Sequence, residues 1–174
     1  MKTSDITIRE AQRVDFTSVA EMHYPVWRQS WTGILTTAVL DLLGPASRWA
    51  AEFYPQSLSR TGWAMWIAES DGKTLGMSIF GPEPAYDNRI HIDALYIAEE
   101  SQRHGIGSRL LNAALLLNPE KDLILWCAEK NDKARRFYEQ QNFHVDGRTF
   151  TWNPLPGVNV AHVGYRLYRP TCQS

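Results

Sequence analysis

The chain has 174 residues, of which 44% are hydrophobic and 21% are charged, the composition of an ordinary globular protein with one sizeable core. The formal net charge is -1 without any basic block, which excludes nucleic acid as the main partner. No apolar run resembles a secretion signal or a membrane span. Cys127 and Cys172 have neither disulfide-framework nor zinc-site spacing. We therefore expect one cytoplasmic domain over residues 1–174, with no metal site and no membrane partner.

Predicted strands and helices follow one another along the whole chain. Strands are inferred from period-two alternation or short apolar runs, and helices from apolar residues three and four apart. In chain order we expect a strand Asp5–Glu10, helices Asp15–Arg28, Thr36–Leu43 and Ala46–Tyr54, strands Trp63–Glu69, Thr74–Phe80 and His91–Ile97, a helix Ile106–Leu117, a strand Leu123–Ala128, a helix Asn131–Gln141, and strands Phe143–Trp152 and Val160–Tyr168. This order predicts an α/β (α+β) fold with a mixed sheet flanked by helices.

Several residues mark where these elements begin, end or turn. Asp15 is expected to cap the first helix, with a capping box starting at Ser18 as the alternative. Pro25 is expected to kink that helix or end it early, because proline lacks the N–H that the helix needs. Asp71-Gly72 between two strands is a strong signal for a tight hairpin.

A glycine turn stands between the strand that ends at Ile97 and the helix that follows. Gly105 and Gly107 leave the backbone N–H groups of the helix start uncovered, and the helix dipole adds positive potential there. Such a helix start binds phosphate. The dinucleotide motif would need a third glycine where Leu110 stands, and the P-loop would need Gly-Lys-Ser/Thr, so neither motif is present. The alternative is a plain tight turn that leads into a helix.

A second motif follows the strand that ends at Ala128. It reads Asn131-x-x-Ala134-x-x-Phe137-Tyr138-x-x-x-Asn142-Phe143. Asn131 is a good N-cap, and the alanine and the two aromatic residues lie on or beside one helix face. Asn142 suits the left-handed residue that ends such a helix. A capped amphipathic helix with a buried aromatic pair is a sufficient structural explanation of this motif.

Together the two motifs resemble those of the GCN5-related N-acetyltransferase (GNAT) superfamily. The first resembles its Gln/Arg-x-x-Gly-x-Gly/Ala motif, and the second its Asn-x-x-Ala-x-x-Phe-Tyr-x-x-x-Gly-Phe pattern. Asn142 departs from the glycine that is usual there. With the flanking strands, the resemblance covers the chain from Trp63 to Tyr168. It implies a mostly antiparallel sheet of about seven strands, splayed at its centre, and an N-acetyltransferase that uses acetyl-coenzyme A without a metal.

The resemblance also implies which residues hold acetyl-coenzyme A. The backbone of the central strand would bind the pantetheine arm, the amides of the glycine turn would bind the pyrophosphate, and two residues of the next helix would contribute from the other side. In that order these residues are Leu95, Tyr96 and Ile97; Gln102, Arg103, His104, Gly105, Ile106, Gly107 and Ser108; and Asn131 and Lys133. Lys133 is equally explained as a solvated helix charge.

The catalytic roles follow from the same resemblance. Tyr138 matches the family's general acid, which protonates the leaving thiolate, although a core tyrosine is the alternative. His91 lies where many members carry a glutamate base, and Asp93 is two residues further along the same strand. Either residue is a candidate for the base, or the two form an orienting pair. A half-buried sheet histidine and a surface aspartate are the structural alternative.

The acceptor is expected to be a primary amine of a small molecule or a peptide. Six of the seven tryptophans fall in elements that wall the acceptor pocket in the family, although core packing is an equally good explanation for several of them. These are Trp27, Trp31, Trp49, Trp63, Trp66 and Trp152. A non-catalytic acyl-coenzyme A binding module of the same fold is the alternative function, and a homodimer is left open.

Overall fold

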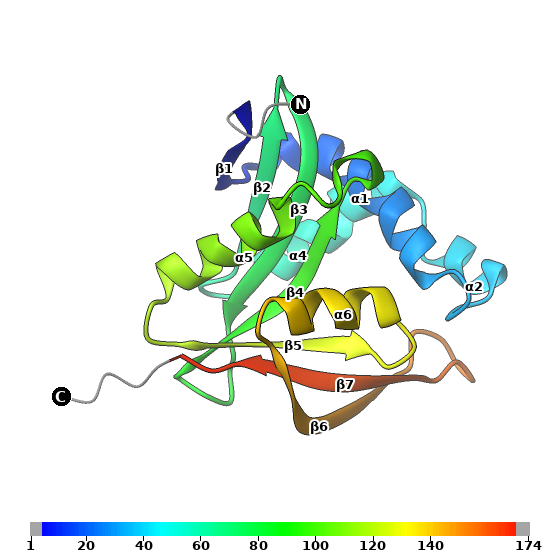
Figure 1. Cartoon of the computed structure of the whole chain (residues 1–174). Helices are drawn as coiled ribbons and strands as arrows, with labels where there is room; N and C mark the ends of the chain where they lie inside the picture. The colour runs from blue at the N-terminus through cyan, green and yellow to red at the C-terminus, as the bar shows by residue number, and fades with distance from the viewer. Residues whose placement is uncertain (1–4, 170–174) are drawn as a thin grey trace.

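The computed structural model describes residues 5–169, and its centre is a seven-stranded sheet in the order β1-β2-β3-β4-β5-β7-β6 (Figure 1). Neighbouring strands are antiparallel except for β4 and β5, which are parallel. The strands are β1 Thr7–Glu10, β2 Ala64–Ser70, β3 Lys73–Pro82, β4 Arg89–Ile97, β5 Asp122–Ala128, β6 His144–Trp152 and β7 Val160–Leu167. The expected mixed, mostly antiparallel sheet is therefore confirmed.

Helices cover both faces of the sheet (Figure 1). The early helices α1 to α4 lie on one face, while α5 and α6 lie on the other. The helical segments are η2 Arg13–Asp15, α1 Phe16–Trp31, α2 Thr37–Leu42, α3 Ala46–Arg48, η3 Trp49–Phe53, α4 Tyr54–Leu58, η4 Glu99–Ser101, α5 Ile106–Leu117 and α6 Asp132–Gln140. Within residues 5–169, none of these helices has the length and apolar character that a membrane crossing requires.

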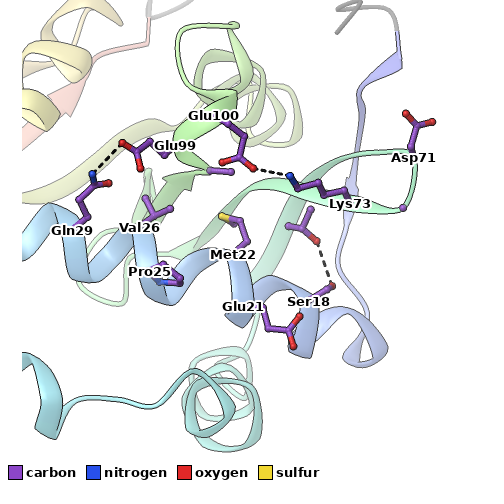
Figure 2. A pocket seen from close by; sticks show the side chains of 13 residues that line it. Ser18, Glu21, Met22, Pro25, Val26, Gln29, Asp71, Lys73, Glu99 and Glu100 are labelled. Atoms are coloured by element: carbon purple, nitrogen blue, oxygen red, sulfur yellow. Dashed lines mark hydrogen bonds and ion pairs between the residues drawn. The ribbon is translucent and has the colours of Figure 1, made fainter.

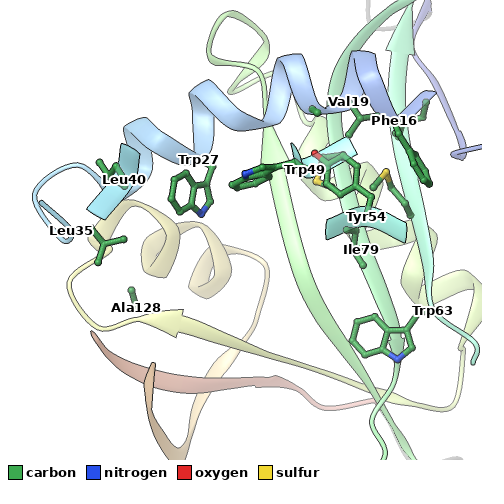
Figure 3. Close-up of a cluster of buried hydrophobic side chains, with 14 of the residues drawn as sticks. Phe16, Val19, Trp27, Leu35, Leu40, Trp49, Tyr54, Trp63, Ile79 and Ala128 are labelled. Carbon is green, nitrogen blue, oxygen red and sulfur yellow. The ribbon is translucent and has the colours of Figure 1, made fainter. Parts of the chain in front are cut away.

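The core is divided between the two faces because side chains alternate along each strand. On β2, Met65 and Ile67 join the cluster under α1, while Trp66 and Ala68 point to the side of α5. The cluster under α1 is rich in aromatic rings, and Figure 3 shows its tryptophans beside the sheet. A bulge between β3 and β4, where the pairing shifts after Ile79, interrupts this alternation on the central strand.

The first helix differs from the sequence-based prediction at both marked residues. Asp15 occupies the N-cap position, but its carboxylate makes no capping bond to the helix. It accepts instead from the Gln12 backbone N–H at 2.7 Å and from the Arg9 guanidinium at 2.8 and 2.9 Å. The expectation that Asp15 caps the helix was wrong because a charged partner on β1 holds the carboxylate.

Pro25 neither ends nor shortens α1, which runs on to Trp31 and so past the expected end at Arg28. Pro25 has no N–H to donate to the carbonyl of Glu21, four residues earlier in the helix. Both residues are exposed, so water can bond to that carbonyl instead. His23 and Trp27 are buried on either side of the proline. Tertiary packing of these rings therefore keeps the helix intact across a residue that would break it in isolation.

Other local expectations are confirmed. Asp71 and Gly72 both have positive φ, 50° and 74°, as a two-residue hairpin turn requires. Asn142 has φ 63°, the left-handed conformation expected after α6. The third early helix, expected over Ala46–Tyr54, is longer than expected, because the helical stretch from Ala46 continues through a π-helical turn to Leu58. Cys127 is a buried free thiol, while Cys172 lies outside the described residues.

Candidate active site

The two central strands separate halfway along their length, and the candidate site begins there. β4 pairs with β5 only from Arg89–Ile92 to Asp122–Leu125. Beyond that point β4 pairs with β3 on its other side, and β5 pairs with β7. The backbone edges of 95–97 and 126–128 are therefore not paired with each other, and we call this unpaired stretch between β4 and β5 the gap.

The glycine turn lies at the end of β4 and opens α5. Gly105 is the N-cap with φ 74°, and Arg103 also has a left-handed φ of 63°. The first backbone bond of the helix runs from the Arg109 N–H to the Gly105 carbonyl at 3.1 Å. The N–H groups of Ile106 and Ser108 therefore have no acceptor within the helix, as at every helix start. The turn has the geometry of an anion-binding helix N-terminus.

Gln102 joins the turn to both neighbouring elements. Its side-chain Nε2 donates to the carbonyl of Ile97 at 3.1 Å, while its Oε1 accepts from Lys133 Nζ at 2.7 Å. The carbonyl of Gln102 accepts from the ring Nδ1 of His104 at 2.8 Å. One side chain thus links β4, the turn and α6. The structure brings these predicted coenzyme-binding residues together at one place.

The start of α6 is built as the sequence predicts. Asn131 is its N-cap, and the side-chain oxygen accepts from the Ala134 N–H at 3.1 Å. Gly107 of α5 lies directly beneath this helix, where an added Cβ would be 2.9 Å from the Phe137 ring. A side chain at position 107 would collide with that ring. Gly107 is therefore explained by close helix packing as well as by its place in the turn.

Tyr138 projects from α6 into a cluster of rings beside β5 and β7. Its ring centroid lies 5.4 Å from Phe137, 5.7 Å from Phe143 and 6.3 Å from Tyr165. Burial raises the pKa of Tyr138 well above its usual value, and the nearby Cys127 adds to this. The phenol is therefore protonated at neutral pH.

His91 and Asp93 lie on the same face of β4, but each has a different partner. The His91 Nδ1 lies 3.4 Å from a carboxylate oxygen of Glu83, and the Asp93 carboxylate accepts from Arg60 at 2.9 Å. Burial lowers the pKa of His91, while the charges of Asp93 and Glu83 oppose that shift. At neutral pH the imidazole is therefore uncharged and able to accept a proton.

Sequence reasoning did not identify Glu83 and Arg60 as neighbours of these residues. The sequence predicts a strand that ends at Phe80, whereas β3 continues to Pro82 and leads directly to Glu83. Because Gly81 pairs with His91 across the antiparallel β3–β4 hairpin, the chain just after Gly81 reaches the histidine. Arg60 lies in the connection after α4 and stacks its guanidinium on Trp63 at 3.4 Å, a contact that no short sequence pattern indicates.

The tryptophans do not form one pocket wall. Trp27, Trp49 and Trp63 are buried in the cluster under α1 (Figure 3), so core packing explains them. Trp66 lies on the opposite face, stacked against Phe80. Core packing, the alternative that the sequence left open, therefore explains these four residues. Trp31 and Trp152 do meet beside the separated strands, with ring centroids 5.1 Å apart.

A pocket of about 600 Å³ lies between α1, the β2–β3 turn and the segment before the glycine turn (Figure 2). Met22 and Val26 of α1 line it beside several carboxylates, and its Lys73 is already paired with Glu100 at 2.7 Å. Glu99 accepts from Gln29 across the same pocket at 3.2 Å. This acidic lining repels phosphate, so the pocket does not suit a pyrophosphate. Within residues 5–169, no group of three or more His, Cys, Asp or Glu side chains is placed to hold a metal.

The chain is similar to known proteins in sequence and in fold. A family model described as "Acetyltransferase (GNAT) family" matches residues 21–143. A probable N-acetyltransferase of Mycobacterium tuberculosis (strain ATCC 25618 / H37Rv) is 66% identical over 169 residues, which cover 97% of each chain. The PaiA N-acetyltransferase from Thermoplasma acidophilum, solved with coenzyme A, has a TM-score of 0.68 at 19% identity, covering 91% of this chain and 97% of that one. YncA from Salmonella typhimurium, solved with acetyl-CoA, has a TM-score of 0.65 at 16% identity, covering 97% and 96%.

Proposed function

The chain belongs to the acetyltransferase (GNAT) family of acetyl-coenzyme A-dependent N-acetyltransferases, and we propose that it acetylates a primary amine of a small molecule or a peptide by direct attack. The amine nitrogen attacks the thioester carbonyl, the new C–N bond forms, and the C–S bond breaks. One proton leaves the nitrogen and one proton reaches the thiolate. We also propose that residues 1–174 form a single domain that performs this reaction.

The observation that carries the proposal is the gap between β4 and β5, which leads to the glycine turn of α5. The pantetheine arm would lie in this gap along the free backbone edge of residues 95–97. The pyrophosphate would accept from amides of residues 103–108, where the helix dipole is positive. Lys133 and Asn131 stand on the α6 side of the same path.

Proton transfer is assigned to residues on either side of the gap. Tyr138 protonates the leaving thiolate, because the phenol carries its proton at working pH and its position on α6 faces the gap from the side opposite β4. His91 accepts the amine proton through water, because its imidazole is neutral and half-buried. The negative charges of Asp93 and Glu83 raise the pKa of His91 and so oppose the effect of burial. A backbone N–H near Ile97 polarises the thioester carbonyl.

Ser108 offers a direct test of the pyrophosphate site. A glutamate in the first turn of α5 favours the helix dipole, so Ser108→Glu should fold, but its charge repels the pyrophosphate. Ser108→Gln is the matched control, since it has the same size without the charge. We expect calorimetry to give at least a tenfold weaker Kd for acetyl-coenzyme A in Ser108→Glu than in Ser108→Gln. Equal affinities in two folded variants would contradict this location.

Turnover is tested by release of coenzyme A thiol with a panel of primary amines and peptides. Thiol release that depends on an amine, with the acetylated amine detected by mass spectrometry, supports the enzyme. Tight binding of acetyl-coenzyme A without acetylation of any amine would instead indicate the non-catalytic acyl-coenzyme A binding module.

A further inference from the structure

Five aromatic side chains form a continuous surface on the α1 side of the second half of the sheet, and we call them the aromatic strip. Trp31 and Trp152 lie 5.1 Å apart, and His162 lies 5.9 Å from Trp31 and 6.3 Å from Trp152. Phe150 lies 5.5 Å from His162 and 5.5 Å from Trp126. Every member thus packs against at least one neighbour by a ring-to-ring contact.

The strip lies on the face opposite α6. On β5 and β7, Leu125 and Tyr165 belong to the cluster under α6, so their neighbours Trp126 and Gly164 point the other way. Phe150 is 44% exposed, which is unusual for a phenylalanine within a strand. The outer part of the strip is therefore an apolar aromatic surface open to a ligand.

One end of the strip joins the gap between the central strands. The Trp31 indole N–H donates to the Tyr96 hydroxyl at 3.4 Å, and Tyr96 is one of the β4 residues that border the gap. His162 pairs with Ala128 in the part of β5 that no longer pairs with β4. A molecule on the strip therefore has one end beside the place proposed for the thioester.

The other end of the strip carries an ion pair. The Arg148 guanidinium stacks on Trp126 at 4.7 Å and is held by Asp146 at 2.6 Å and by the Tyr165 carbonyl at 3.2 Å. Gly164 makes room for this pair, because a Cβ there would be 2.6 Å from the Asp146 carboxylate. This pair has no net charge, so it does not orient an amine by itself; the amine faces the Tyr96 end because the thioester is proposed to lie there.

The middle of the strip is uncharged. The His162 Nδ1 donates to the Val160 carbonyl at 2.9 Å, and burial lowers the pKa of the ring, so the imidazole is neutral at pH 7. This buried neutral ring supports the exposed rings beside it and does not repel an ammonium group at the adjacent end.

On the basis of the proposed acetyl transfer, we propose that the strip binds the acceptor and that the acceptor is a primary amine carrying an aromatic ring. The ring packs on the exposed Phe150 and the half-buried Trp126, while a short alkyl chain carries the amine toward Tyr96. A diamine fits poorly because its second ammonium would leave water for the uncharged rings of the strip. A peptide fits less well because the strip offers ring faces and few free hydrogen-bonding groups.

The test compares matched amines in the thiol-release assay: 2-phenylethylamine, 4-phenylbutylamine, 2-cyclohexylethylamine, n-butylamine and 1,4-diaminobutane. We expect kcat/KM to be at least tenfold higher for an aromatic amine than for the cyclohexyl or butyl amine, and lowest for the diamine. Phe150→Ala should lower the aromatic advantage about tenfold through KM, with kcat and the KM for acetyl-coenzyme A little changed. Val145→Ala, an exposed residue of the same strand on the face of Tyr165, is the control and should keep wild-type kinetics.

Direct binding separates this proposal from the proposed function. Calorimetry with 2-phenylethylamine, in the presence of coenzyme A, should show binding that Phe150→Ala weakens, even if no amine is acetylated. Acetylation of butylamine or a peptide without preference for the ring, or an unchanged preference in Phe150→Ala, would overturn the strip proposal while the acetyltransferase stands. A dimer seen by sedimentation would also overturn the proposal, if Phe150→Ala dissociates it and no aromatic amine binds. A second copy of the chain would then cover the strip.

Discussion

At the scale of single residues, the environment of Tyr138 decides its chemistry. Three aromatic rings surround it, and burial raises its pKa. A buried phenol is a weak acid that keeps its proton at neutral pH, so it can give that proton only to a base formed beside it in the same desolvated site, such as the leaving thiolate. This favours a role in the second half of the reaction, after the amine has attacked.

We expect Tyr138→Phe to lower kcat about 10- to 1,000-fold, the range typical of one lost proton-transfer group. The ring contacts remain in this variant, so the Kd for acetyl-coenzyme A and the free energy of unfolding should stay close to wild type. Steady-state kinetics and calorimetry measure these quantities. Tyr168→Phe, which alters an exposed tyrosine, is the control. Wild-type kcat in Tyr138→Phe would assign this tyrosine to the core alone.

His91 is surrounded by charges of both signs. Glu83 and Asp93 raise its pKa, Arg148 and Arg60 lower it, and burial lowers it further. The net direction is downward, so the neutral base survives to lower pH than for a free histidine. Activity that needs this base is lost as the pH falls through the pKa of His91.

We expect His91→Ala to lose the most turnover in the acid part of the active range, where free amine is scarcest. Glu83→Gln removes a charge that raises the His91 pKa, so the acid limb of the pH–rate profile should move to lower pH. Asp93→Asn should shift the limb in the same direction, with a smaller loss of turnover than His91→Ala. Profiles that coincide with wild type in these variants would mean that the amine loses its proton to solvent.

At the scale of elements, the contact between α5 and α6 couples the glycine turn to the helix that carries Tyr138. Gly107 allows the Phe137 ring to approach the backbone of α5, and Gln102 ties the turn to Lys133 on α6. The two family motifs are therefore in direct contact in the fold. A change in one helix is expected to shift the other.

Gly107→Ala should lower the free energy of unfolding by about 1–3 kcal/mol, the usual effect of an overpacked contact. Urea denaturation measures this loss. Leu116→Ala, at an exposed position of the same helix, should stay within about 0.5 kcal/mol of wild type. Adding Phe137→Leu to Gly107→Ala should recover part of the loss, because the smaller side chain relieves the overlap. Strictly additive losses would show that the two residues do not touch.

At the scale of the whole molecule, one buried histidine links stability to pH. His23 of α1 packs against Trp49 and Tyr96 and shares a 2.9 Å hydrogen bond with the Tyr54 hydroxyl, while its Nε2 is buried without a partner. Burial lowers the pKa of His23 from 6.5 to about 3. Between these values the unfolded chain binds a proton that the folded chain does not, so folding becomes less favourable as the pH falls.

We expect the free energy of unfolding to fall by a few kcal/mol between pH 6.5 and 3, with His23 contributing much of the slope. His23→Phe should flatten the slope, because the apolar ring binds no proton. His144→Gln, which removes an exposed histidine on β6, should keep the wild-type slope. Denaturation curves at several pH values give these slopes. A slope unchanged by His23→Phe would place the pH sensitivity elsewhere.

The sequence alone determined the features that depend on neighbouring residues. The order of strands and helices, the Asp71-Gly72 turn, the Asn131 cap and the glycine turn at Gly105 all follow from local spacing, and the structure has each of them. These features are local because φ/ψ preferences and capping bonds involve residues a few positions apart. The family resemblance rests on the same short patterns.

Only the tertiary structure decided which distant residues meet. The pairing of β3 with β4 brings Glu83 to His91, and the loss of pairing between β4 and β5 opens the gap. Packing kept α1 helical through Pro25, while a salt bridge to Arg9 drew Asp15 away from its cap. The aromatic strip joins residues from α1, β5, β6 and β7. Such contacts depend on strand register and on which face of the sheet each helix covers, and no short stretch of sequence contains that information.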